Sequence, residues 1–393
     1  MAVLLANSAL MSAGFYLLIP LLSVHLTQNA GFSGAAAGAV LAVRQLTQQG
    51  LMPFGGALAD RVGYRPIIAL GMLVRALGFF GFALGDDLSV VLLSAVVAAL
   101  GGALFEATGK ASLAALAPDA ERPRLFSLSA LAGGIGTTGG PLLGTLLLPL
   151  GFAWVGIAAG VFFVLAGILA ALLLPPLAPP GGGAPSLGQT LRAVSRDGAF
   201  LRFTALLTGY WFLHNQIYIS VPLRAVQVTG SAGIVGVLYA TAAAAGLALQ
   251  YPLVRLASRI MTPASTVAAG VALMGAGLGM MGLAGGPSSV AVLVLSVVVF
   301  AAGRALAEPT KDVVVAGMAP AGSLAGYFGV AFLALAAGGS AGNYAGGWLF
   351  DVATATGSAV LPWLVFAVCG LLIAGALFAF SRTWTRPVAR AAG

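Results

Sequence analysis

Long apolar stretches alternate with short charged or Gly/Pro-rich breaks along almost the whole chain. A helix needs about 20 apolar residues to cross the hydrocarbon core of a bilayer, and stretches of that length recur throughout. The pattern therefore predicts an all-α membrane protein with twelve spans. The expected spans are residues 4–27, 34–57, 66–84, 88–109, 125–148, 151–174, 201–228, 232–254, 264–284, 288–310, 322–349 and 357–380.

A connection rich in proline and glycine separates the first six spans from the last six. From Pro175 to Gly183 the chain contains four prolines and three glycines, and a polar stretch follows. Such a composition is typical of a flexible connection. We therefore expect a six-helix bundle over residues 1–174, a cytoplasmic linker over 175–200, and a second six-helix bundle with a short cytoplasmic tail over 201–393.

The composition excludes a soluble fold. The 393 residues are 60% hydrophobic and 7% charged, whereas soluble domains have roughly 45–50% apolar and about 25% charged residues. The net charge of +8 does not indicate a nucleic-acid partner, because the basic residues are spread through short connections and form no single patch. The one cysteine, Cys369, lies in the last apolar segment and is expected to pack there.

The distribution of charge predicts the topology. Basic residues gather in the even-numbered connections and in the tail, whereas the odd-numbered connections carry acidic residues and only one arginine, Arg224. By the positive-inside rule, both termini are expected in the cytoplasm. The even-numbered connections and the tail contain Arg61, Arg65, Arg122, Arg124, Arg192, Arg196, Arg202, Arg255, Arg259, Arg382, Arg386 and Arg390, and the odd-numbered ones contain Asp86, Asp87 and Asp351.

The two halves resemble each other at an offset near 200 residues. Glu106 in span 4 ends the run Gly-Ala-Leu-Phe-Glu, and Glu308 in span 10 ends Arg-Ala-Leu-Ala-Glu. The Leu-Ala-Asp-Arg run after span 2 has a counterpart after span 8, with Ser258 in place of Asp60. These matches predict an internal structural repeat, as in many transporters. Low-complexity Ala/Gly sequence would explain the glycines but not the placed charges.

A loop between spans 2 and 3 contains Gly56, Asp60, Arg61, Gly63 and Arg65. The pattern of these residues resembles the signature loop of the major facilitator superfamily. The glycines permit a tight turn, the arginines hold the loop at the cytoplasmic surface, and the carboxylate can face a helix N-terminus. The resemblance implies that Asp60 is a gating residue that joins the two halves in one state. The alternative is an ordinary positively charged loop with a chance aspartate.

Span 5 is rich in glycine and resembles the motif associated with antiporters of the same superfamily. The matching residues are Gly136, Gly140, Pro141 and Gly144, whereas Thr145 replaces the usual final glycine. Small residues at every fourth position let two helix backbones approach closely, and proline adds a bend. Close packing without any bearing on transport is the alternative explanation.

Four further runs give a more specific resemblance. They begin at Arg44 (Arg-Gln-Leu-Thr-Gln-Gln-Gly), at Gly71 (Gly-Met-Leu-Val-Arg-Ala-Leu-Gly-Phe), at Ala307 (Ala-Glu-Pro) and at Gly346 (Gly-Gly-Trp-Leu-Phe-Asp). They are similar to the multidrug-resistance MdtH group of the twelve-span drug/proton antiporters in the major facilitator superfamily. The resemblance implies two six-helix bundles related by pseudo-two-fold symmetry. The chain departs from many drug antiporters in two ways, since span 1 has Asn7 instead of an acid, and span 4 has no basic residue before Lys110.

Ionisable side chains inside spans are costly in lipid and are therefore functional candidates. At about 1.5 Å per residue, Arg44, Arg75 and His214 are expected near the middle of the bilayer, and Glu106 and Glu308 toward the cytoplasm. The candidate proton-coupling residues are Glu106, Glu308 and His214. The candidate substrate cavity consists of Arg44, Gln45, Gln48, Tyr210, Trp211, Asn215 and Arg304.

Each of these candidates has a structural alternative. His214 could be a neutral packing residue, although an ordinary histidine pKa near 6.5 suits proton exchange. Lys110 lies four residues after Glu106, and Arg304 lies four before Glu308, so each carboxylate could simply be neutralised by its neighbour. Arg44 could be functional or structural. The resembled family places span 3 outside the bundle, which favours a structural role for Arg75.

The sequence favours a secondary active exporter that exchanges protons for small amphipathic compounds by alternating access. An importer or a carrier of lipid-like substrates with the same fold is the alternative. A membrane-embedded enzyme is not expected, because the chain has two histidines, one cysteine and no His-Glu-x-x-His motif. No nucleotide-binding loop is present either. We expect no cofactor or metal, a monomer in the bacterial cytoplasmic (inner) membrane, and small molecules, protons and lipid as the partners.

Overall fold

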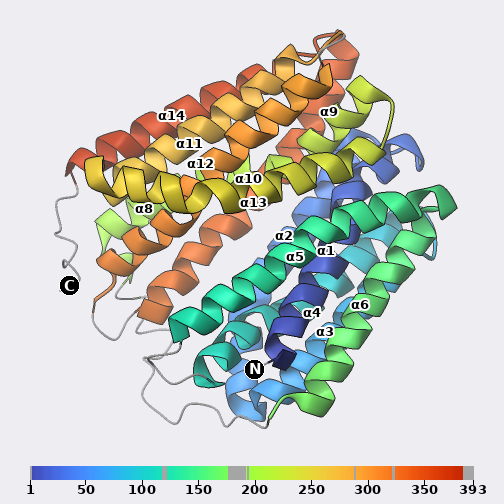
Figure 1. Ribbon diagram of the computed structural model, residues 1–393, viewed down its shortest axis with the longest axis vertical. Coiled ribbons are helices and arrows are strands. Elements are labelled where there is room, and N and C mark those ends of the chain that lie inside the picture. The colour runs from blue at the N-terminus through green and yellow to red at the C-terminus, as the bar shows by residue number, and fades with distance from the viewer. Residues whose placement is uncertain are drawn as a thin grey trace. The chain divides into compact units, whose positions relative to one another are not determined.

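The computed structural model describes residues 2–116, 122–175, 192, 194–286, 289–320 and 324–383, and within these ranges the chain is helical without any strand (Figure 1). The expected all-α fold class is confirmed. The first half contains α1 (Ala2–Gln28), α2 (Gly34–Val62), α3 (Tyr64–Gly81), α4 (Leu88–Leu116), α5 (Arg122–Leu147) and α6 (Phe152–Leu173). The second half contains α8 (Gly198–His214), α9 (Ser220–Thr229), α10 (Gly233–Ile260), α11 (Pro263–Met280), α12 (Ser289–Met318), α13 (Leu324–Thr356) and α14 (Leu361–Thr383).

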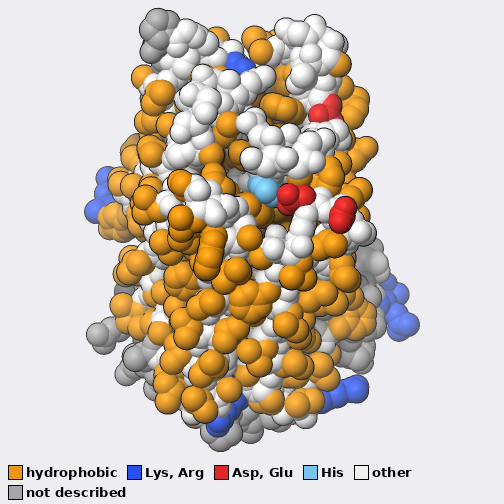
Figure 2. Space-filling model, turned by 90° about the vertical axis from the view of Figure 1, so that its right-hand side faces the viewer, with side chains coloured by type: hydrophobic (Ala, Val, Ile, Leu, Met, Phe, Trp, Pro, Cys, Tyr) orange, Lys and Arg blue, Asp and Glu red, His pale blue; other side chains and the backbone are white. Residues whose placement is uncertain are grey.

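Nine helices of the described chain are long and apolar enough to cross a membrane by themselves. The other three expected spans correspond to α2, to α13, and to α8 together with α9. The middle of α2 is polar, because Arg44, Gln45, Gln48 and Gln49 interrupt its apolar sequence. Apolar side chains cover most of the face in Figure 2, as expected for a surface in contact with lipid.

The seventh span is not the continuous helix that its apolar sequence predicts over residues 201–228. Helix α8 ends at His214, a short 3-10 turn covers Asn215–Ile217, and α9 begins at Ser220. Pro222 explains the interruption, since its ring clashes with the carbonyl of residue 218 and it has no N–H to donate to that carbonyl. The carbonyl of Tyr218 instead accepts a hydrogen bond from the Ser23 hydroxyl at 3.1 Å.

The helices pack into two compact units. Unit 1 comprises residues 1–182, 217–243 and 343–351, and unit 2 comprises 183–216, 244–342 and 352–393. In unit 1, α1 packs against α5 and α6, and α4 packs against α2 and α3. In unit 2, α11 lies between α12 and α14 (Figure 1). Because α9 and parts of α10 and α13 join unit 1, the units do not follow the linker alone, and the division at residues 175–200 remains a prediction.

Candidate functional site

Four of the described polar side chains of α2 are buried within unit 1, and three of them, Arg44, Gln45 and Gln48, are joined by hydrogen bonds. Arg44 is only 3% exposed, and Gln45 and Gln48 are buried with it. The Arg44 guanidinium donates from Nη1 to Oε1 of Gln48 and from Nη2 to Oε1 of Gln45, both at 3.3 Å. Residues four apart share a helix face, so α2 turns Arg44 and Gln48 in the same direction.

Gln48 connects this group to α3 and α4. Its Nε2 donates to Oε2 of Glu106 at 2.6 Å, and its Oε1 also accepts from Nη1 of Arg75 at 3.5 Å. One neutral amide therefore faces two guanidinium groups with its oxygen and a carboxylate with its nitrogen. We call Arg44, Gln45, Gln48, Arg75 and Glu106 the N-terminal polar cluster. The expected ion pair with Lys110 cannot be assigned, since that side chain lies outside the described residues.

Arg75 belongs to this cluster although the resembled family places its helix on the outside of the bundle. It is 4% exposed, and its guanidinium lies 5.1–5.8 Å from the ring centres of four phenylalanines of α1, α3, α4 and α6. Aromatic faces attract cations, so the rings partly replace the water that this charge has lost. The four rings are those of Phe15, Phe79, Phe105 and Phe163.

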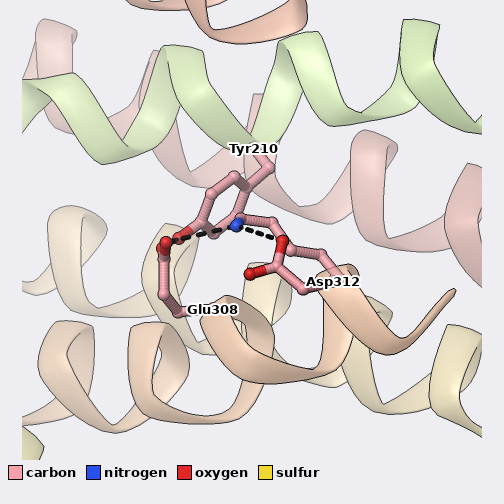
Figure 3. Close-up of polar contacts among 4 residues, drawn as sticks. Tyr210, Glu308 and Asp312 are labelled. Carbon is pink, nitrogen blue, oxygen red and sulfur yellow. Dashed lines mark hydrogen bonds and ion pairs between the residues drawn. The ribbon is translucent and has the colours of Figure 1, made fainter. Parts of the chain in front are cut away.

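A second cluster lies in unit 2, between α8 and α12. The Tyr210 hydroxyl donates to Oε2 of Glu308, and Nζ of Lys311 lies 3.2 Å from Oε1 of the same carboxylate (Figure 3). Lys311 also lies 2.9 Å from Oδ1 of Asp312 and 5.2 Å from the Trp211 ring centre. We call Tyr210, Trp211, Glu308, Lys311 and Asp312 the C-terminal polar cluster.

The sequence offered Arg304 as a restraining cation for Glu308, and the structure adds a second cation, because Lys311 forms an ion pair with this carboxylate. Helical side chains lean toward the N-terminus, so Lys311 leans back over Glu308. The spacing Glu-x-x-Lys was visible in the sequence and could have identified Lys311. Arg304 itself lies one turn before Glu308 on α12.

His214 and Asn215 lie at the end of α8, where the seventh span is interrupted. The His214 ring packs against Trp211 and Tyr210, at ring-centre distances of 5.0 and 5.8 Å. The Asn215 side chain donates from Nδ2 to the carbonyl oxygen of Trp211 at 2.9 Å. Asn215 therefore satisfies a helix end, whereas His214 joins the aromatic side of the C-terminal polar cluster.

The loop between α2 and α3 makes a sharp turn at Gly63. This residue has a φ of 101°, which favours glycine, and it both ends α2 and begins α3. Arg65 donates from Nε to the carbonyl oxygen of Ala171 in α6 at 2.8 Å, which fixes the start of α3. Gly56 and Arg61 lie in the last turns of α2. The side chain of Asp60 lies outside the described residues, so its gating role remains a prediction.

The glycines of α5 form a close contact with α1. A Cβ added at Gly140 would lie 2.7 Å from the carbonyl oxygen of Ala13, and one added at Gly136 or Gly144 would also meet the α1 backbone. These glycines therefore allow the two helices to pack backbone to backbone. Pro141 lies in the same stretch of α5. Any bearing of this motif on transport direction remains a prediction.

Sequence reasoning treated Asp351 only as an acidic residue outside the membrane. In unit 1 its Oδ1 accepts from the N–H of Gly34 at 2.6 Å, and its Oδ2 accepts from the N–H of Ala35 at 2.8 Å. Ser33 caps the next free N–H, that of Ala36, at 3.1 Å. The start of α2 is thus capped by its own serine and by an aspartate of α13, more than 300 residues away in the chain. No local signal in the sequence predicts this contact.

The contact between α2 and α13 depends on glycine. A Cβ added at Gly34 would lie 2.5 Å from the carbonyl oxygen of Gly347, and Gly38 similarly faces the backbone at Asn343. The two helices therefore touch backbone to backbone on the side where Asp351 caps α2. We call Gly34, Gly38, Asn343, Gly347 and Asp351 the outer contact.

The sequence of this chain is similar to that of a known protein family. The sequence profile described as Major Facilitator Superfamily matches residues 4–260. Two relatives named "Multidrug resistance protein MdtH", from Sodalis glossinidius (strain morsitans) and Edwardsiella ictaluri (strain 93-146), are each 35% identical to this chain. The first alignment covers 94% of this chain and 90% of the relative, and the second covers 95% and 92%.

Solved structures support the same fold. A POT family transporter in complex with 5-aminolevulinic acid superposes with a TM-score of 0.81 at 14% identity, covering 98% of this chain and 96% of that one. An auto-inhibited POT family peptide transporter has a TM-score of 0.81 at 18% identity, covering 100% and 98%. Identities this low establish the fold alone.

Proposed function

The chain belongs to the Major Facilitator Superfamily, and from that premise we propose that it exports small amphipathic compounds in exchange for protons. It is a multi-pass membrane transporter and not an enzyme. The observation that carries the proposal of export is the 35% identity, over nearly the whole length, to proteins named for multidrug resistance. The alternative, an importer or a carrier of lipid-like substrates, shares the fold.

We assign proton coupling first to Glu106, because its environment differs from that of Glu308. Glu106 accepts from the neutral amide of Gln48, so its protonation removes a charge without separating a direct ion pair in the described cluster. Glu308 touches the ammonium group of Lys311 and accepts from Tyr210. Protonation of Glu308 would therefore break an ion pair, which is costly in a partly dry site.

We propose that the outer contact closes the non-cytoplasmic side during alternating access. Two hydrogen bonds join a carboxylate to the first two N–H groups of α2, where the helix dipole favours negative charge. The Asp60 loop would serve the same purpose on the cytoplasmic side. The basic connections and tail support a topology with both termini in the cytoplasm.

Proteoliposomes with a pH-sensitive dye inside test both the coupling and the direction. In exchange, entry of a compound drives protons out, whereas import by symport moves both in the same direction. Glu106→Gln should abolish accumulation driven by a pH difference while leaving counterflow of labelled against unlabelled compound intact. Glu308→Gln is the matched comparison, and loss of coupling in this variant alone would contradict the assignment to Glu106.

A further inference from the structure

The N-terminal polar cluster holds more positive than negative charge. Its described side chains include two guanidinium groups and one carboxylate, and that carboxylate bonds to Gln48 instead of to either arginine. Arg44 donates only to neutral amide oxygens at 3.3 Å, and the Nε atoms of Arg44 and Arg75 have no acceptor within the described chain. A buried cation without a charged partner is costly, so the site is suited to an anion.

Arg44 is better placed than Arg75 to receive that anion. Arg75 is enclosed by four phenylalanine rings, whereas Arg44 has one ring, Phe15, at 5.0 Å. Its two bonds to glutamine amides are long for hydrogen bonds from a charged donor, and a carboxylate can replace both with a bidentate pair.

Apolar rings extend from Arg44 within unit 1. Phe15 packs edge-on against Tyr16 and Tyr218, with ring centres 5.1 and 6.2 Å apart. Tyr239 lies 6.2 Å from Tyr16. These rings provide a surface for the apolar body of a compound whose charged group is bound at Arg44.

Resting on the function proposed above, we infer that Arg44 and Glu106 are two subsites of opposite charge for a zwitterionic amphipathic compound. Arg44 binds the anionic oxygen group of the compound. Exchange requires that the compound and the proton exclude each other, so the basic nitrogen of the compound occupies Glu106 when that carboxylate has released its proton. Gln48, which touches both residues, sets their separation. A purely anionic compound has no basic nitrogen to take the place of the proton at Glu106 and would not be exchanged for it.

Three probes with one apolar body test these subsites on the purified protein. They are para-octylphenylalanine, its methyl ester, which lacks the anion, and its N-acetyl derivative, which lacks the cation. The wild-type protein should bind the zwitterion about tenfold more tightly than either derivative, a ratio set by the loss of one charge-assisted hydrogen-bonded contact. Equal affinity for all three probes, or no binding of the zwitterion, would overturn the inference without any variant.

Variants assign each charge to its residue. Arg44→Gln should bind the zwitterion and its methyl ester equally while still rejecting the N-acetyl derivative, and Glu106→Gln should show the reverse. Arg259→Gln, which removes an exposed arginine at the end of α10, should leave both ratios unchanged. If Arg44→Gln does not fold, Arg44→Lys should keep discrimination against the ester at reduced affinity. Unchanged ratios in the folded variants would refute the two subsites.

The binding and transport measurements distinguish failure of the two subsites from failure of the proposed exchange mechanism. If the charge discrimination is found but the zwitterion moves no protons in proteoliposomes, the subsites stand and the exchange mechanism is wrong. If a probe without the anion drives proton exchange as well as the zwitterion does, the exchange mechanism stands and the Arg44 subsite is wrong.

Discussion

Replacing Asp351 with asparagine tests the outer contact most directly. The aspartate offers one oxygen to each of the first two N–H groups of α2, at 2.6 and 2.8 Å. Asparagine has one acceptor oxygen and no charge, so one of these bonds and the attraction to the helix N-terminus are lost. The loss should amount to about 1–2 kcal/mol, since charge at a helix terminus contributes about 0.3–1 kcal/mol and a hydrogen bond about 1 kcal/mol.

That free energy predicts a measurable shift in conformation. A change of about 1–2 kcal/mol alters the ratio of two states by about 5- to 30-fold. The population in which α2 and α13 separate should therefore increase. Spin labels at exposed Asn29 and Ala355 can follow it, because a longer distance component should grow in Asp351→Asn but not in the wild-type protein.

The matched control is Asp87→Asn, which neutralises an exposed acid expected on the same side of the membrane as Asp351. It should leave the distance distribution unchanged. Asp351→Glu keeps the charge but lengthens the side chain, so its longer distance component should be smaller than that of Asp351→Asn and larger than that of the wild-type protein. If Asp351→Asn gives the wild-type distances and the wild-type transport rate, the outer contact does not gate transport.

Gly140→Ala should lower the melting temperature, because its Cβ would lie 2.7 Å from an α1 carbonyl oxygen, whereas Gly139→Ala, with no atom within 4 Å, should not. Cysteines at positions 87 and 124 should react with an impermeant reagent in intact cells only at 87, and the reverse result would contradict the topology. Asp60→Asn should slow transport without unfolding the protein; an unchanged rate and unchanged inter-label distances would remove its gating role.

The succession of helices could be predicted because the length of an apolar stretch is a local property of the sequence. The interruption of the seventh span was also encoded locally, by Pro222, yet the apolar pattern concealed it. The sequence predicted several members of the polar clusters, among them Arg44, Gln48 and Glu308, but neither Lys311 nor Asp312, and it predicted none of the hydrogen bonds. Gln48 joins Glu106 from 58 positions away, and only the packing of α2 against α4 brings the two together.

Contacts between distant segments account for what the sequence could not predict. Asp351 lies more than 300 residues from Gly34 in the chain, and the signal at each end is a single common residue. The surroundings of Arg75 are similar, since four helices contribute one phenylalanine each. Phenylalanine is so frequent in membrane helices that its spacing identifies no partner.

The modest strength of the outer contact has a consequence for the transport cycle. Reversing an equilibrium from 1:99 to 99:1 requires about 5.5 kcal/mol, several times the 1–2 kcal/mol that Asp351→Asn is expected to remove. The charge of Asp351 by itself can therefore bias the proposed closed state but cannot reverse the equilibrium. The close approach of Gly34 and Gly347 supplies packing, which is lost only when the helices separate. Asp351 binds the N-terminus of α2 only moderately, at a point where Gly34 and Gly347 let the two helices touch. Such a contact suits a gate that must open in every transport cycle.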